Sequence, residues 1–159
     1  MMRIALLSLV LPALLAAGCV QKADVEELAM NVAEAGGLKV QVQLPGRQFQ
    51  TGEKLRVTVT ATNTTKEPIH VVAPSGAPVL VRITRHTALS AEEVKYYPQS
   101  ATTNIHSWSL PAKQSRKFVL MVPVEPDWPV GEVLHVSAEL NGLPKLSPSV
   151  YVVVAPPRK

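Results

Sequence analysis

Four histidines are the side chains of this sequence best suited to metal chemistry. His70 and His135 lie in segments where polar and apolar residues alternate, and both point away from their apolar neighbours. In a sandwich whose third and sixth strands are neighbours, these imidazoles would share a face and, with a third ligand, could hold copper or zinc. His86 and His106 flank a long polar stretch and could approach each other. Because no two histidines are close in sequence, we expect scattered surface histidines and no metal site, with a periplasmic metal-binding module as an alternative.

Acidic residues are badly placed to support catalysis. Asp24 lies near the N-terminus and Asp127 in a proline-flanked turn, so neither is well placed to orient a catalytic histidine. The sequence contains no Gly-x-Ser-x-Gly elbow, no glycine-rich phosphate loop and no His-Glu-x-x-His motif. We therefore expect no enzyme activity, no catalytic residues and no cofactor.

Two adjacent tyrosines stand out in a chain that is only 4% aromatic. Tyr96 and Tyr97 fall in the polar stretch 87–103, which shows no regular period. Irregular loops longer than about 12–15 residues are uncommon unless they are functional or disordered, and tyrosine is enriched in interaction hot spots. We predict that this loop binds a protein partner, with one tyrosine packed inward and the other projecting. The alternative is that one tyrosine merely covers a sheet edge.

The only cysteine ends a segment with the character of a secretory signal. A positive residue precedes an apolar run over residues 4–15, which is shorter than the roughly 20 apolar residues that cross a bilayer. The end of this segment resembles a bacterial lipobox and reads Leu15-Ala16-Ala17-Gly18-Cys19. The resemblance implies a signal peptide over residues 1–18 and lipidation of Cys19, with alanine at a position where the pattern prefers leucine. Ordinary cleavage that leaves a free thiol is the alternative.

The charge and the residue after the cysteine bear on location and partners. The net charge of +4 includes no basic run longer than two residues, so we expect no nucleic-acid partner. Lipoprotein sorting, as implied by the resemblance, places a chain with Val20 after the cysteine in the outer membrane, facing the periplasm, if the cell is Gram-negative. The expected partners are the membrane, through the lipid anchor, and a protein of the cell envelope.

The elements that must position these residues differ on the two sides of residue 38. Within residues 19–37, apolar residues recur at helical spacing before Gly36 and Gly37, which predicts a short tether helix, or alternatively a docking helix. From Leu38 the period changes to two, which is typical of half-exposed antiparallel strands. The predicted strands cover residues 38–44, 55–62, 69–72, 79–85, 104–110, 116–122, 132–140 and 150–154.

These runs predict an all-β fold for residues 38–159, specifically an Ig-like antiparallel β-sandwich of seven to nine strands. A closed eight-stranded barrel is the alternative. Apolar side chains on one side of each strand should form the core, together with Trp108 and Trp128.

The turns between the strands follow a recognisable order. A strand ends at Asn63 and Thr64, a Pro-hydrophobic pair follows at Pro68, and a Leu-Pro turn begins at Leu110. This order is similar to that of the BsuPI-type intracellular proteinase inhibitor domain, with Ala112 where that domain has glycine. The resemblance implies an Ig-like sandwich and, as an alternative function, protease inhibition by insertion of the 87–103 loop. The leading expectation is a lipid-anchored, non-enzymatic envelope protein that acts as a protein-binding or assembly module.

Overall fold

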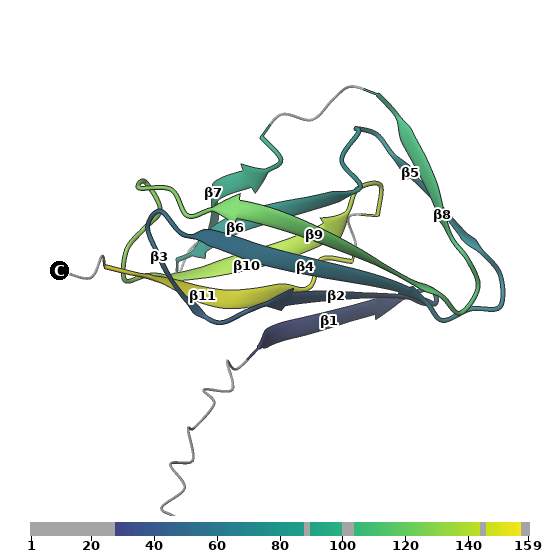
Figure 1. Ribbon diagram of the computed structural model, residues 1–159, viewed down its shortest axis with the longest axis horizontal. Coiled ribbons are helices and arrows are strands. Elements are labelled where there is room, and N and C mark those ends of the chain that lie inside the picture. Colours follow the sequence, from purple (N-terminus) through teal and green to yellow (C-terminus); the bar gives the residue numbers. More distant parts are fainter. Residues whose placement is uncertain (1–27, 88–89, 100–103, 144–145, 157–159) are drawn as a thin grey trace, which may run out of the picture.

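The computed structural model describes residues 28–87, 90–99, 104–143 and 146–156, and in these parts the chain forms strands and turns without a helix (Figure 1). The described strands are β1 (Ala29–Ala35), β2 (Leu38–Leu44), β3 (Gln48–Gln50), β4 (Lys54–Asn63), β5 (Ile69–Ala73), β6 (Val79–His86), β7 (Ala91–Tyr97), β8 (His106–Leu110), β9 (Ser115–Pro123), β10 (Val133–Leu140) and β11 (Ser149–Ala155).

The strands form two main sheets and a separate hairpin. One sheet has the order β1-β2-β4-β9, the second has the order β3-β11-β10-β6-β7, and β5 pairs with β8. Neighbouring strands are antiparallel except for the short β3–β11 pair. In Figure 1 the two main sheets lie one over the other, and the β5–β8 hairpin extends from one end. The predicted all-β sandwich is confirmed, and the barrel alternative is wrong because β7 and β9 remain at the ends of separate sheets.

The core lies between the two main sheets and follows the alternation of the sequence. Leu55, Val57 and Val59 of β4 have no solvent exposure, and Leu134 and Val136 of β10 are buried opposite them in the second sheet. Burying each such side chain contributes roughly 1.5–3 kcal/mol. Both tryptophans are buried as predicted.

The predicted tether helix is wrong for the part that the structure describes. Residues 29–35 form β1, which pairs with β2 along its whole length, and residues 19–27 lie outside the described residues. Gly36 and Gly37 have φ angles of 57° and 76°, the positive values that a tight hairpin turn needs at both central positions. A short isolated helix is only marginally stable in water, so hydrogen bonding to β2 prevails. The sandwich therefore begins at β1 rather than at residue 38.

The predicted 87–103 loop is also wrong for residues 91–97, which form the edge strand β7. This strand contains adjacent charges and no clean alternation, and its pairing with β6 is interrupted by an irregularity beside Ile83. Together with β1 and the three-residue β3, it raises the described strands to eleven, above the predicted seven to nine. The protease-inhibition alternative thus loses the central part of its inserting loop.

The Asn-Thr motif holds the end of β4 against the β5–β8 hairpin. The fully buried Asn63 amide donates hydrogen bonds to the carbonyl oxygens of Glu67 (2.7 Å) and Leu110 (3.0 Å). Its carbonyl oxygen accepts one from the backbone N–H of Thr65 at 2.8 Å. One side chain therefore satisfies polar groups of the turn after β4 and of the end of β8.

Candidate functional site

Tyr96 and Tyr97 lie on β7 and point to opposite sides of the second sheet. Tyr97 stands opposite Val81 of β6 and is 8% exposed, so it belongs to the core side. Tyr96 stands opposite Arg82 and is half-buried on the outer face, where the guanidinium carbon of Arg82 lies 5.2 Å from the ring centre. The predicted inward and outward arrangement is confirmed, and Tyr96 is the tyrosine available to a partner.

A charged network fastens Tyr97 to the segment after β9. The Tyr97 hydroxyl donates a hydrogen bond to Glu125 Oε1 at 2.9 Å. Lys95 Nζ lies 2.8 Å from Glu125 Oε2 and 2.8 Å from Asp127 Oδ2. These contacts join the C-terminal end of β7 to the turn that precedes β10.

The network shifts the proton affinities of its members. Burial, and then the hydrogen bond to Glu125, raise the pKa of Tyr97 to about 12. The hydrogen bonds to Asp127 and Glu125 raise the pKa of Lys95. Hydrogen bonds from Lys95 and Tyr97 lower the pKa of Glu125. At neutral pH the network therefore holds a neutral Tyr97 phenol, a cationic Lys95 and an ionised Glu125, an arrangement that positions β7.

A groove of about 370 Å³ runs between the edges of β7 and β9. Its wall on the β7 side includes Tyr97 and Pro98, joined by a cis peptide bond, and its wall on the β9 side includes Leu120 and Pro123. A second hollow of about 220 Å³ shares Pro98 and Leu120 and adds the half-buried Phe118. The open side of the sandwich thus presents a mainly apolar groove between two strands that each stand at the end of a sheet.

The glutamates of β7 form ion pairs with arginines of β6. Glu93 Oε2 lies 3.0 Å from Arg82 Nη1, and Glu92 pairs with Arg85. Charged side chains on an edge strand oppose indiscriminate pairing with other strands. These charges therefore protect the edge of β7 from indiscriminate pairing.

The histidines do not gather where the sequence suggested. His70 lies on β5 in the hairpin, away from His135 on β10 of the second sheet, so the predicted shared face is wrong. Instead, the His135 ring stacks on His86 at 3.8 Å and meets the Tyr151 ring edge-on at 4.4 Å. Burial, and then the neighbouring His86, lower the pKa of His135. Within the described ranges, no three His, Cys, Asp or Glu side chains are arranged to hold a metal ion.

The His86–His135 contact was missed because it depends on sheet order. Only the pairing of β6 with β10 brings these two residues together. His106 begins β8 and is exposed, so the expected approach of His86 and His106 is replaced by the stacked pair.

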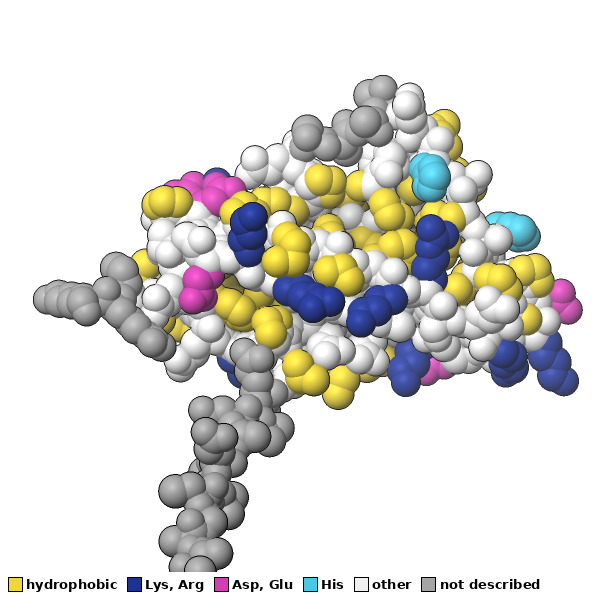
Figure 2. All heavy atoms as spheres, viewed as in Figure 1, with side chains coloured by type: hydrophobic (Ala, Val, Ile, Leu, Met, Phe, Trp, Pro, Cys, Tyr) yellow, Lys and Arg dark blue, Asp and Glu magenta, His cyan; other side chains and the backbone are white. Residues whose placement is uncertain are grey.

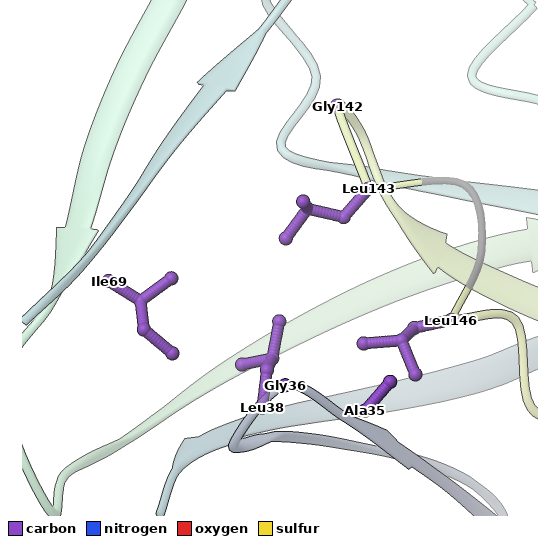
Figure 3. A pocket seen from close by; sticks show the side chains of 7 residues that line it. All are labelled: Ala35, Gly36, Leu38, Ile69, Gly142, Leu143 and Leu146. Atoms are coloured by element: carbon purple, nitrogen blue, oxygen red, sulfur yellow. The ribbon is translucent and has the colours of Figure 1, made fainter. Parts of the chain in front are cut away.

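A larger apolar cavity of about 490 Å³ lies at the end of the sandwich near the β5–β8 hairpin (Figure 3). The figure shows Leu38, Ile69 and Leu146 converging on it from different segments. Gly142 borders the cavity with a φ angle of 98°, and a Cβ there would lie 2.3 Å from the carbonyl oxygen of Val72. Glycine is therefore required for this close approach. The lining offers shape and apolar contact but no charged group.

The predicted lipidation site, Cys19, and the signal peptide before it lie outside the described residues. Where the structure describes the chain, no helix is long and apolar enough to cross a membrane.

Comparisons with known proteins find matches among solved structures only. No family model matches it, and no curated protein matches it. A β-glucosidase from Listeria innocua, solved with isofagomine, shares 16% identity and a TM-score of 0.43 over 81% of this chain and 16% of that one. The sporulation control protein Spo0M from Bacillus subtilis shares 14% identity and a TM-score of 0.49 over 79% of this chain and 51% of that one. This chain thus matches about half or less of each, and the likeness carries no functional argument.

Proposed function

We propose that this protein is a lipid-anchored, non-enzymatic module of the cell envelope that binds a protein partner along the edge strand β7. The observation that carries the proposal is the position of this edge between two different contact surfaces. Tyr96 stands on the outer side of β7, and the groove against β9 lies on its inner side.

Strand addition would use both surfaces at once. An extended segment that pairs with an exposed sheet edge gains main-chain hydrogen bonds, and its alternate side chains point to opposite sides. One set would meet Tyr96 and the Arg82–Glu93 pair, and the other would enter the groove beside Leu120. The expected partner is therefore an extended segment that alternates polar and apolar residues.

The lipid anchor is the second part of the proposal, and it is supported by the lipobox resemblance at Cys19. Acyl chains would hold the sandwich at a membrane surface in the envelope, the outer membrane in a Gram-negative cell. The Cys19→Ser variant should lose acyl-chain labelling and accumulate as uncleaved precursor or soluble protein. Unchanged labelling of this variant would contradict the anchor.

Site-specific crosslinking tests the binding site directly. A photo-reactive phenylalanine analogue in place of Tyr96 should capture an envelope protein in living cells. The matched control carries the analogue at Tyr151, which is 54% exposed and lies on β11 of the same sheet. Capture of the same protein with equal yield at both positions would contradict a site on β7.

A truncation separates binding from stability. Tyr96→Ala should reduce the free energy of binding to that partner by about 2 kcal/mol or more, the loss expected of a hot-spot residue. Its melting temperature should stay close to that of the wild type, because the ring is half-buried on the outer face. With the partner bound, amide hydrogen exchange should slow in residues 91–97, and unchanged exchange there would argue against strand addition.

A further inference from the structure

The outward face of the sheet β1-β2-β4-β9 has a composition unlike that of a merely solvated surface. Strand register aligns its outward side chains in rows across the sheet. Two of these rows, from β1 to β9, are Met30-Gln43-Thr58-Val119 and Val32-Gln41-Thr60-Lys117. Met30 is 57% exposed, Met121 54% and Val119 47%. Apolar groups are thus presented to the outside on the two edge strands, β1 and β9, and polar side chains of β2 and β4 lie between them.

Cations on this face have no carboxylate partner among the described residues. Lys39, Lys54, Arg56 and Lys117 point outward, and none has a carboxylate within 4 Å among the described residues. On the outward positions of these strands the described acidic residue is Glu34, at the end of β1. Figure 2 shows dark blue basic side chains alternating with yellow hydrophobic ones across this face.

A hollow of about 170 Å³ on the same face brings cations and neutral donors together. It is lined by Arg56, Lys117, Thr58 and Gln43, with Leu28 and the turn after β2 at its border. A guanidinium, an ammonium, a hydroxyl and a carboxamide are donors that suit the oxygens of a phosphate group. The hollow therefore has the chemistry to receive an anionic phosphate beside apolar side chains.

The chain also enters the sandwich at this face. Leu28, the first described residue, itself lines the hollow, and eight residues lie between it and Cys19. Such a segment spans at most roughly 30 Å. An acyl anchor at Cys19 would therefore keep this face close to the lipid surface.

We propose that the outward face of the sheet β1-β2-β4-β9 docks on an anionic lipid surface, with a headgroup phosphate held between Arg56 and Lys117. The closeness of this face to the lipid rests on the proposed lipid anchor. The match between its basic side chains and an anionic surface does not depend on that anchor. Basic side chains near an anionic membrane are attracted to it, and the exposed methionines and valines can enter the interface. A basic patch would add a second attachment to that of the acyl chains.

Methionine oxidation tests the docked orientation. Met30 and Met121 are the methionines of the chain beyond the signal segment, and both lie on this face. The acylated full-length protein is placed on vesicles of phosphatidylcholine, with or without phosphatidylglycerol, and its oxidation by peroxide is followed by mass spectrometry. Oxidation of both methionines should be slower on the vesicles that contain phosphatidylglycerol, and high salt should abolish the difference.

Charge reversal identifies the groups responsible. The mature chain that starts at residue 19 and carries Cys19→Ser has no acyl group. It should float with phosphatidylglycerol vesicles but not with vesicles of phosphatidylcholine alone. Adding Arg56→Glu and Lys117→Glu should weaken that binding by roughly tenfold or more. The matched control, Arg47→Glu with Lys66→Glu, makes the same change in net charge at exposed positions off this face and should bind almost normally.

The outcomes separate the docking face from the anchor. Loss of phosphatidylcholine binding in Cys19→Ser reports on the anchor alone. Equal oxidation on both kinds of vesicle, while flotation shows the acylated protein bound, would overturn the docking face and leave the anchor intact. Stabilisation by inorganic phosphate through Arg56 and Lys117, without an effect of vesicles, would replace the lipid surface with a soluble anion.

Discussion

The two main sheets differ in whether their outward cations have carboxylate partners among the described residues. On the five-stranded sheet, Arg82 pairs with Glu93 at 3.0 Å and with the nearly buried Glu139 at 3.4 Å. On the four-stranded sheet, Arg56 and Lys117 have no carboxylate within 4 Å among the described residues. Paired charges hold neighbouring strands in register, whereas unpaired charges leave their interactions open to something outside the chain. The difference therefore separates a face that serves the fold from one suited to a partner surface.

The largest expected effect is on Asn63, whose side chain joins the end of β4 to the β5–β8 hairpin. Asn63→Ala should destabilise the protein by about 2–4 kcal/mol, because it leaves the buried carbonyl of Leu110 and backbone groups of Thr65 and Glu67 without this partner. Urea unfolding of the variant and the wild type gives the difference. Asn31→Ala is the matched control, since the Asn31 amide is exposed and makes one long-range hydrogen bond, to the carbonyl oxygen of Ser149 at 2.8 Å. A similar loss in both variants would contradict the role assigned to Asn63.

The second prediction addresses the contrast between the sheets directly. Arg82→Met should cost about 1–3 kcal/mol, because it leaves the nearly buried Glu139 carboxylate without its cation. Lys117→Met removes an exposed cation that has no carboxylate within 4 Å among the described residues, and it should change the free energy of unfolding by no more than about 0.5 kcal/mol. Urea midpoints at neutral pH compare the two variants. Equal costs would show that the cations of the two sheets are not energetically distinct.

The third prediction concerns Tyr97, whose hydroxyl is tied to Glu125. Tyr97→Phe should cost about 1 kcal/mol through loss of this hydrogen bond. The folded-state pKa of about 12 exceeds the ordinary value of 10.0, so the folded state keeps a proton that the unfolded state loses. Stability contributed by this group is complete below pH 10.0 and is lost as the pH rises towards about 12. Denaturation across this window should show a smaller alkaline loss in Tyr97→Phe, and an unchanged loss would assign it to other groups.

The smallest expected effect is at acid pH. Because Lys95 and Tyr97 lower the pKa of Glu125, its contribution to stability is present above the ordinary pKa of 4.5 and is lost as the pH falls through the folded-state value. Glu125→Gln should therefore show a shallower acid decline of melting temperature than the wild type. Lys117→Met, on the other sheet, should follow the wild-type curve. A parallel decline in wild type and Glu125→Gln would contradict this role of Glu125.

The core and the opposite directions of the two tyrosines could be predicted because both depend on alternation along single strands. Leu134 and Val136 fall on the buried side of β10, and Tyr97 faces inward while Tyr96 faces outward. The stacking of His135 on His86 could not be predicted in the same way. It depends on which strands are neighbours, and many sheet orders are compatible with the same set of alternating segments.

Prediction from the local sequence pattern failed where pairing with another strand outweighs the local preference for a helix or a loop. Residues 29–35 carry apolar side chains at helical spacing, yet the turn at Gly36 and Gly37 brings them alongside β2. Residues 91–97 show no strand period, yet β6 supplies their hydrogen-bond partners, and its arginines hold Glu92 and Glu93. In both cases the stabilising groups lie on another strand.

What the sequence by itself determined was the all-β class, the apolar side of most strands and the burial of Trp108, because each follows from side-chain type and a period of two. What only the tertiary structure decided was which edges stay open and which charges are neutralised. The groove between β7 and β9 and the Arg82–Glu139 pair depend on sheet order, as does the lack of a carboxylate near Arg56 and Lys117 in the part of the chain that the structure describes. Strand pairing joins residues far apart in the chain, and the energies that select one order belong to those contacts rather than to any local segment.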